Sequence, residues 1–287
     1  MKISVIGAGY VGLANAIVLS KRHKISVVDV DEAKVNDINA HICPIKDDNS
    51  FAKAFRKTRN IIATTDLKES VSEANLVIIS VPTPLNEKTN NLDTSIVEET
   101  VREVVKVNRE AIIVIKSTIS VGTTRKLSEL YNSSQIIYSP EFLREKHALE
   151  DINNPYRIVI GIDKLDKKCI LNAREYGNLM ISSLKKTHIK IRIIGEEEAE
   201  AVKLFSNAYL SMRLTYFNEL DRFAADKGIK MEEIVDAICL DPRIGDKYNV
   251  PNKDGFSGKC LPKDLDEVIA ETNSDLFKSV KKVNNKK

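Results

Sequence analysis

The sequence has no tryptophan, only four cysteines and four histidines, and no long apolar run. Its longest apolar stretches, such as Leu76–Val81 and Ala111–Ile115, are far shorter than the roughly 20 residues that a membrane span requires. The cysteines lack C-x-x-C spacing and the histidines lack metal-ligand spacing, so we expect neither a disulfide framework nor a bound metal. These absences argue against membrane-spanning proteins, disulfide-rich domains and zinc modules.

The sequence also has no large excess of positive or negative charge. The formal net charge is +3, but the last ten residues carry five lysines and no acid, which leaves −2 for the rest of the chain. The basic character is therefore mainly a property of the tail, and it gives little support to nucleic-acid binding. Met1 and Lys2 lead into a short strand-like run and then glycines, unlike a signal peptide, so we expect a cytoplasmic protein without a membrane partner.

A glycine-rich turn follows the first predicted strand. Lys2–Ile6 is rich in β-branched residues and leads into Gly7-Ala8-Gly9-Tyr10-Val11-Gly12, which opens the helical pattern of Leu13–Lys21. A G-x-G-x-x-G here provides a tight turn, a backbone that a pyrophosphate can approach, and close packing of helix on strand. The next strand, Ile25–Val30, carries Asp29, whose carboxylate suits ribose hydroxyls and disfavours a 2′-phosphate. We therefore predict an NAD site; the alternative is a glycine turn with an incidental aspartate.

Strands and helices then alternate, which predicts an α/β fold with a Rossmann-like, doubly wound, mainly parallel sheet. Apolar runs at Asn75–Val81 and Ala111–Lys116 indicate strands buried on both faces, with a helix at 94–107 between them. Further strands are expected at 135–138, 157–162 and 190–193, with a helix at 166–182. Ligands of such sheets bind beyond the carboxyl ends of the strands. The turn residues expected there, unless they are only caps and turn formers, are Thr83, Thr118, Glu141 and Glu145.

One long helical pattern, Glu196–Lys227, contains neither proline nor glycine. Its apolar residues lie nearly all round, so we expect a buried helix, either between domains or against another subunit. Lys203 and Asn207 are four residues apart and share one face. One interpretation is that both side chains point into a site, where a cation and an amide would stabilise a negatively charged oxygen. The other is that Lys203 extends to solvent.

A lone cysteine, Cys260, stands just before Pro262, a residue type suited to the first turn of a helix. Helix-end amides and the lysines Lys259 and Lys263 would favour its thiolate, which is the nucleophilic form. The alternative is a small apolar residue in a turn. A helix at 231–238 and two loops, 241–245 and 248–252, precede it; the loops carry turn formers and groups suited to phosphate and base contacts.

Seven segments together resemble the UDP-glucose/GDP-mannose dehydrogenase superfamily, and within it the UDP-glucose 6-dehydrogenases. They occur in the order and spacing of that family across nearly the whole chain. The segments are G-A-G-Y-V-G at Gly7–Gly12, K-S-T at Lys116–Thr118, S-P-E-F-L-R-E at Ser139–Glu145, E-A-E-A-V-K-L-F-S-N at Glu198–Asn207, Y-F-N-E-L-D at Tyr216–Asp221, R-I-G at Arg243–Gly245 and K-C-L-P-K-D at Lys259–Asp264.

The resemblance implies an NAD-dependent oxidation of a UDP-sugar at C6 in two hydride transfers, through a thiohemiacetal and a thioester. Cys260 would be the nucleophile, Lys203 and Asn207 would stabilise the oxyanion, Asp264 and Thr118 would assist proton transfer through a water, and Glu145 would assist thioester hydrolysis. The implied NAD-site residues are Gly7, Gly9, Tyr10, Val11, Gly12, Asp29, Lys34, Thr83, Thr118, Glu145 and Lys263. The implied substrate residues are Glu141, Phe142, Leu143, Arg144, Glu145, Lys203, Asn207, Arg243, Tyr248, Asn249, Val250, Pro251, Asn252 and Ser257.

The same resemblance predicts the domain organisation. Residues 1–195 would form the NAD-binding domain, and residues 196–275 the central helix with a helical dimerisation and catalytic domain. Residues 276–287 would form a basic tail at the start of the C-terminal UDP-binding domain that family members have, and we expect this chain to lack the rest of that domain. We expect a homodimer through 196–227, across whose interface Arg243 is a candidate to reach.

One residue departs from the family pattern. Ser257 stands where the family usually has glycine, and a positive φ there would cost roughly 1–2 kcal/mol. Two alternatives to UDP-glucose oxidation stay open. The first is oxidation of UDP-N-acetylmannosamine or GDP-mannose, and the second is a truncated NAD-binding remnant that does no chemistry.

Overall fold

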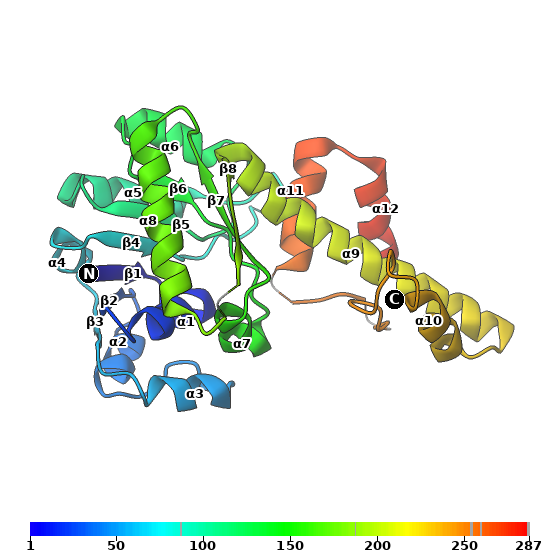
Figure 1. Cartoon of the computed structure of the whole chain (residues 1–287). Coiled ribbons are helices and arrows are strands. Elements are labelled where there is room, and N and C mark those ends of the chain that lie inside the picture. Colours follow the sequence, from blue (N-terminus) through cyan, green and yellow to red (C-terminus); the bar gives the residue numbers. More distant parts are fainter. Residues whose placement is uncertain (87, 187, 253–254, 259, 286–287) are drawn as a thin grey trace. The chain divides into compact units, whose positions relative to one another are not determined.

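The computed structural model describes residues 1–86, 88–186, 188–252, 255–258 and 260–285. In these ranges eight strands form one sheet, and their bounds are β1 (Lys2–Ile6), β2 (Lys24–Val28), β3 (Ile61–Thr64), β4 (Leu76–Ile79), β5 (Ile112–Ile115), β6 (Ile136–Tyr138), β7 (Arg157–Ile162) and β8 (Lys190–Gly195) (Figure 1). The helices are α1 (Tyr10–Leu19), α2 (Glu32–Asn39), α3 (Asn49–Phe55), α4 (Leu67–Ser72), α5 (Ser95–Val107), α6 (Thr123–Tyr131), α7 (Ala148–Asn153), α8 (Lys167–Ser183), α9 (Glu196–Lys227), α10 (Met231–Cys239), α11 (Leu261–Thr272) and α12 (Asp275–Asn284), with a 3-10 turn at Glu145–His147.

The strand order is β3-β2-β1-β4-β5-β6-β7-β8. Every neighbouring pair is parallel except β6 and β7, which are antiparallel. The chain runs outward from β1 to β3, returns to β4 beside β1, and runs outward again on the other side. The predicted doubly wound, mainly parallel sheet is therefore confirmed, and its order reverses between β1 and β4, where such sheets bind ligands.

Alternate residues of the central strands enter two separate cores. Leu76 and Ile78 of β4 lie in one apolar cluster together with residues of α1, α3, α7 and α8. Val77 and Ile79 lie in the other, with residues of α4, α5 and α6. Since successive side chains of a strand point to opposite faces, a sheet covered on both faces requires strands that are apolar throughout. This explains the continuous apolar runs in the sequence.

The bounds of β1, β7 and α9 agree with the sequence prediction, whereas β3 and the helices α2, α3, α4, α6 and α7 were not predicted. The strand β3 has only four residues and pairs with β2 alone, and Ile62 within it is 66% exposed. Such a strand shows neither a long apolar run nor a clear alternation.

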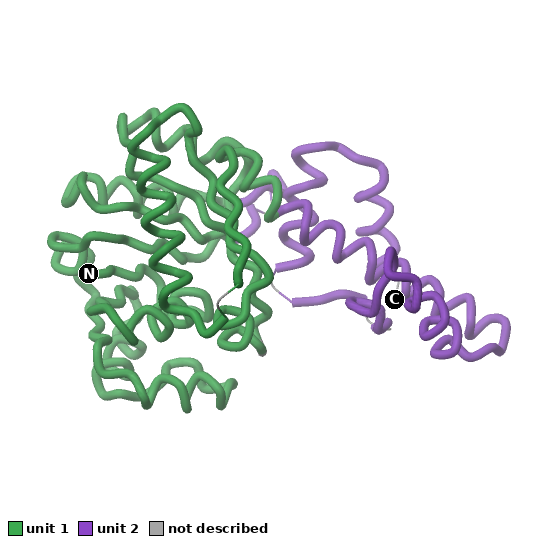
Figure 2. The backbone as a smooth tube through the Cα atoms, in the orientation of Figure 1, with its two compact units in different colours: residues 1–83, 93–203 green, residues 84–92, 204–287 purple. Residues whose placement is uncertain are grey.

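Two compact units make up the chain. Unit 1 contains residues 1–83 and 93–203, and unit 2 contains residues 84–92 and 204–287 (Figure 2). The division falls within α9, between Lys203 and Leu204. Unit 2 also includes the segment 84–92, in which Leu85 and Leu92 form an antiparallel bridge. The predicted boundaries at 195 and 275 stay a prediction.

Helices α9, α11 and α12 share an apolar core in unit 2. Leu204, Leu265 and Val280 are buried in it, and so is Leu92, whose backbone N–H donates to the buried carboxylate of Glu267 (2.6 Å). The helix α12, which the sequence assigned to a basic tail, thus packs within this unit. Among the described residues, no helix has both the length and the apolarity to cross a lipid bilayer.

The helix α9 exposes a stripe of aromatic side chains. Phe205, Tyr209, Tyr216 and Phe223 are between 44% and 58% exposed. At 3.6 residues per turn these four positions fall within about 40° of one another, on one face that extends roughly 27 Å. The sequence predicted a helix buried between domains or against another subunit; within this chain one face is buried and this face is open.

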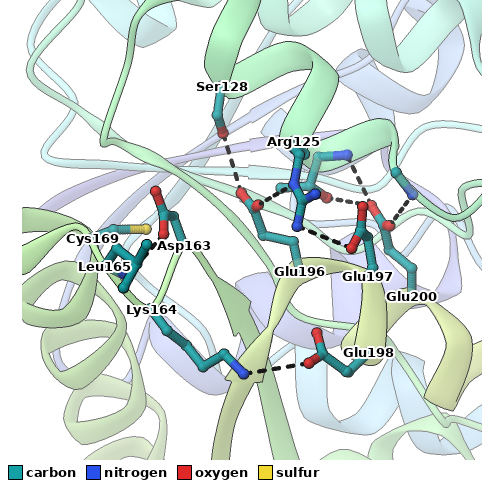
Figure 3. A network of polar contacts seen from close by, with 12 residues as sticks. Arg125, Ser128, Asp163, Lys164, Leu165, Cys169, Glu196, Glu197, Glu198 and Glu200 are labelled. Atoms are coloured by element: carbon teal, nitrogen blue, oxygen red, sulfur yellow. Dashed lines mark hydrogen bonds and ion pairs between the residues drawn. The ribbon is translucent and has the colours of Figure 1, made fainter.

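The first turn of α9 is fixed by its glutamates (Figure 3). The carboxylate of Glu200 accepts hydrogen bonds from the backbone N–H groups of Gly122 (2.6 Å) and Thr124 (2.8 Å) and from the Thr124 hydroxyl (2.6 Å). Glu200 therefore caps α6, whose first N–H groups have no partner within the helix. It joins the turn that contains Thr118 to the helix that carries Lys203.

Glu196, the first residue of α9, is 4% exposed and is affected by the charges of Asp163 and Glu200. Burial, and then the charges of Asp163 and Glu200, raise the pKa of Glu196 to about 7, although Arg125 (3.9 Å) and the Ser128 hydroxyl (3.4 Å) act in the opposite direction. Glu196 is therefore partly protonated near neutral pH, where an ordinary glutamate is ionised.

We expect the Glu196→Gln variant to be more stable than the native protein at pH 8 and similar at pH 5. The pKa of Glu196 is higher in the folded state than in the unfolded state. The folded state therefore binds more protons between about pH 4.5 and 7, and the free energy of unfolding falls as the pH rises through this window. A neutral glutamine removes that loss, so the melting temperature at pH 8 should rise by about 2–4 °C. Thermal unfolding at several pH values measures it, with exposed Glu198→Gln as the control. Equal pH profiles for Glu196→Gln and the native chain would contradict the prediction.

Candidate active site

The three glycines of the G-x-G-x-x-G turn have different surroundings. Gly7 has a φ of +100°, and a Cβ there would lie 2.5 Å from the carbonyl oxygen of Ser80. A Cβ on Gly12 would lie 1.9 Å from the carbonyl oxygen of Gly7, so this residue packs α1 against the turn. A Cβ on Gly9 would meet no protein atom within 4 Å. The backbone at Gly9, the N-cap residue of α1, is therefore open to a ligand, as a phosphate site at a helix N-terminus requires.

Asp29 lies directly after β2 and contacts this turn. Its carboxylate accepts hydrogen bonds from the N–H groups of Ala8 (2.7 Å) and Asp31 (3.0 Å) and from the ammonium of Lys34 (3.4 Å). The structure thus brings Asp29 and Lys34 to the glycine turn, where the sequence placed both. With one helix N-terminus for phosphates and one carboxylate for ribose hydroxyls, the group of residues fits a dinucleotide.

Tyr10 contacts residues that the sequence did not predict to lie beside it. Its hydroxyl donates to Asp47 (2.7 Å), and its ring meets Phe51 edge to face. The hydrogen bond to Asp47, then burial and the charges of Asp47 and Glu145, raise the pKa of Tyr10 to about 12. Val11, the next residue of the turn, is half-buried.

The turns after β4 and β5 are tied together. The Ser117 hydroxyl donates to the carbonyl oxygen of Val81 (2.7 Å). Of the predicted residues in these turns, Thr83 is buried and Thr118 is half-buried. After β6, Glu141 pairs with buried Lys116 (3.2 Å), and exposed Arg144 pairs with Asp151 (2.7 Å). The predicted residues of unit 1 therefore follow β1, β2, β4, β5 and β6 at one edge of the sheet.

The Phe142 ring lies near two cations. The Arg157 guanidinium is 4.2 Å from its centroid, and the Lys203 ammonium is 5.8 Å away. Leu143, the next residue, packs against the core of unit 1. Lys203 is buried, at 8% exposure, so the alternative in which it extends to solvent is wrong.

In unit 2, Cys260 is exposed and occupies the N-cap position of α11, with Pro262 in the first turn as predicted. Fully buried Asp264 follows one turn later, and its N–H donates to the Cys260 carbonyl (2.9 Å). The carboxylate of Asp264 accepts from the Asn207 side chain (2.5 Å) and pairs with Lys263 (3.5 Å). Asn207, Asp264 and Cys260 are thus joined in one arrangement, while Lys259 lies outside the described residues.

The loop before Cys260 is held by α12. The Asn284 amide accepts from the Phe256 N–H (2.7 Å) and donates to the Phe256 carbonyl (3.2 Å). Positive φ values occur at Gly255 and Gly258, and Ser257 between them has none. The backbone condition under which Ser257 would cost stability is therefore not met.

The loop 241–252 has two anchors on α9 that sequence reasoning missed. Arg213 donates to the carbonyl oxygens of Gly245 (2.7 Å) and Lys247 (2.5 Å), and Asn218 accepts from the N–H of Asn252 (2.8 Å). Both are polar, but so are many other residues of α9, so the sequence did not single them out. The other predicted residues of this loop have different surroundings. Arg243 pairs with Asp241, and Asn249 donates to the Cys239 sulfur (3.4 Å). Tyr248 has a φ of +54°, Val250 is 74% exposed and Pro251 is half-buried.

Comparison with known proteins supplies the family. Residues 1–177 match the NAD binding domain of the UDP-glucose/GDP-mannose dehydrogenase family, and residues 197–286 match its central domain. The chain belongs to this family. It is a dehydrogenase of the nucleotide-sugar type, with a domain that binds NAD.

Individual relatives agree. The UDP-glucose 6-dehydrogenase of Streptococcus pneumoniae is 40% identical over 270 residues, which is 94% of this chain and 68% of that protein. The enzyme of the same name from Campylobacter jejuni is 39% identical over 272 residues, covering 94% and 67%. Among solved structures, a UDP-glucose dehydrogenase from Pyrobaculum islandicum superposes with a TM-score of 0.86 at 28% identity, covering 98% of this chain and 67% of that one.

The glycines give a matched test of the NAD site. Gly9→Ala should keep the melting temperature within about 2 °C, because the added methyl meets no protein atom, but it should weaken NAD binding at least about tenfold by occupying the phosphate approach. Gly12→Ala should lower the melting temperature by about 5 °C or more, since its methyl collides with Gly7. Calorimetric NAD titration and thermal unfolding measure both effects. Native affinity in Gly9→Ala would remove Gly9 from the phosphate site.

Proposed function

We propose that this chain oxidises the C6 alcohol of UDP-glucose to the carboxylate of UDP-glucuronate, in two steps that use two NAD⁺. The observation that carries the proposal is Cys260 at the N-cap of α11, joined through Asp264 to Asn207, in a chain 40% identical to a UDP-glucose 6-dehydrogenase. In this reaction a thiol nucleophile lets the second oxidation proceed on a covalent adduct.

Bound NAD⁺ supplies the hydride acceptor for both oxidations. In the first, Asp264 and Thr118 accept the proton of the C6 alcohol through a water, and the aldehyde forms. The Cys260 thiolate then attacks the aldehyde carbon, a C–S bond forms and the carbonyl oxygen becomes an oxyanion. Lys203 and Asn207 stabilise that charge, since a fixed cation and an amide act strongly where water is excluded.

The second hydride leaves the same carbon, and the adduct becomes a thioester. Glu145 then helps a water attack the acyl carbon, the C–S bond breaks and the carboxylate product leaves with the Cys260 thiolate restored. Phe142, Leu143, Arg144 and the loop 243–252 bind the UDP-sugar in this proposal. The cofactor residues other than Lys263 lie in unit 1 with Lys203, whereas Lys263, Asn207 and Cys260 lie in unit 2.

Related substrates are the second candidate. A UDP-D-ManNAc dehydrogenase from Pyrococcus horikoshii superposes with a TM-score of 0.86 at 25% identity, covering 99% of this chain and 68% of that one. Assays with UDP-glucose, UDP-N-acetylmannosamine and GDP-mannose in parallel separate these substrates. Two NADH for each sugar nucleotide identify the substrate, and no turnover with any of them at saturation supports the non-catalytic remnant.

Cys260→Ser should lower the rate of uronate formation by on the order of 10³-fold or more, because the thioester cannot form. NAD binding should stay native, since exchanging sulfur for oxygen at Cys260 leaves the glycine turn and Asp29 unaltered. Product analysis by mass spectrometry and calorimetric NAD titration give the two readouts. Cys43→Ser, a change at a half-buried cysteine of unit 1, is the control and should stay active. Unchanged uronate production by Cys260→Ser would overturn the assignment.

We also propose a homodimer formed through α9. The support is the exposed stripe of Phe205, Tyr209, Tyr216 and Phe223, because soluble single chains rarely leave a row of large apolar residues open. The double change Tyr216→Glu with Phe223→Glu should weaken dimerisation at least about tenfold by placing charges in the interface. Analytical ultracentrifugation measures it. Ala225→Glu, on the opposite side of the helix, should leave the dimer intact, and a monomeric native chain would refute the proposal.

A further inference from the structure

Lys116 has no role in the chemistry above, yet its environment is unusual for a lysine. The side chain is only 5% exposed, at the end of β5. Its ammonium donates to the Ser139 carbonyl (3.1 Å) and the Tyr176 hydroxyl (3.4 Å) and pairs with the Glu141 carboxylate (3.2 Å). Lysine is among the residues least often buried, and it is buried only when paired.

Lys116 is charged under ordinary conditions. Burial opposes the charged form of Lys116, but Glu141 and Tyr176 outweigh it and raise the pKa of the ammonium above its ordinary value. Lys116 therefore provides a permanent positive charge at the end of β5, directed at the turn that follows β6.

Both oxygens of Glu141 fix that turn. One pairs with Lys116 and the other accepts from the N–H of the next residue, Phe142 (2.9 Å). The carbonyl of Ser139, at the start of the turn, is held by the same ammonium. The turn 139–142 is thus fixed at both ends by Lys116, directly and through Glu141.

The ring of Phe142 extends this arrangement to Lys203. Its centroid lies 5.8 Å from the Lys203 ammonium, within the range of a cation–π interaction. From Lys116 through Glu141 and Phe142 to Lys203, each step is a direct contact within unit 1.

We propose that Lys116 is a positioning residue, which fixes the turn 139–142 so that the Phe142 ring places the ammonium of Lys203. The catalytic part of this inference rests on the proposed function, in which Lys203 stabilises the oxyanion. It also changes the interpretation of Glu141, whose carboxylate is directed at Lys116 and at its own turn. An ammonium misplaced by about 1 Å can cost on the order of 10²-fold in rate.

The test uses the double variant Lys116→Met with Glu141→Gln, which removes both charges and so leaves no unpaired charge in the core. The probe is the chemical shift of the Lys203 side chain in protein labelled with ¹³C-lysine, assigned by its loss in Lys203→Arg. A lysine near the face of a phenyl ring has upfield-shifted Cε protons. We expect the upfield shift in the native chain, its loss in Phe142→Leu, and a large reduction in the double variant.

Glu141→Gln alone is the second variant, because it nearly preserves side-chain volume and should show part of the reduction. The matched control is Lys126→Met with Glu98→Gln. Lys126 on α6 pairs with Glu98 on α5 at 3.1 Å near the surface, and removing this pair should leave the Lys203 shift unchanged. A native Lys203 shift in both Glu141→Gln and the folded double variant would overturn the proposal and leave Lys116 with a structural role only.

Kinetics separate this proposal from the proposed function. If the native chain oxidises UDP-glucose, the double variant should lose about tenfold or more in kcat while KM changes by less than about threefold, since the oxyanion contact is made only after binding. The control pair should keep both values. If no native turnover is found, the proposed function fails, and the Lys203 chemical shift still decides whether Lys116 positions Lys203.

Discussion

The close contact between Gly12 and Gly7 is the constraint on which the rest of unit 1 depends. A Cβ at Gly12 would lie 1.9 Å from the Gly7 carbonyl oxygen, so α1 can start directly after β1 only because this side chain is absent. The Gly7 N–H donates to the Val28 carbonyl at the end of β2 (2.8 Å), and Asp29, the next residue, bonds Ala8. The order of the sheet reverses beside this turn, and the polar turns after β4, β5 and β6 follow along the same edge.

The helix α9 carries different kinds of chemistry along its length. Near its start it holds two buried acids, Glu196 and Glu200, and burial raises the pKa of both, that of Glu196 to about 7. One turn later, Lys203 lies against an aromatic ring. Farther along, one face of the helix is buried and another carries the exposed aromatic stripe. A helix with these demands cannot show a simple amphipathic pattern, which is why its sequence looked apolar all round.

The sequence predicted what depends on local pattern. The glycine turn, the apolar strands, the bounds of α9 and the N-terminus of α11 each leave a periodic or compositional signal within a few residues. It did not predict contacts that join distant segments. Asn284 holds Phe256, Arg213 holds the loop 245–247, and Asp47 holds Tyr10, and in each case a common polar residue is selected only by where the fold places it. The resemblance assigned Glu141 to the substrate, but the partner of its carboxylate, Lys116, is 25 residues earlier, directly after β5.

Ser257 illustrates how the backbone decides which departures from a family pattern matter. In the loop before Cys260, the left-handed conformation falls on Gly255 and Gly258, and a Cβ at Gly255 would also lie 2.5 Å from the Asn284 side chain. Those two positions therefore require glycine, for conformation at both and for space at Gly255. Ser257 lies between them with its side chain exposed and without a positive φ. A serine can be accommodated there without backbone strain, so this departure from the family pattern carries no conformational cost.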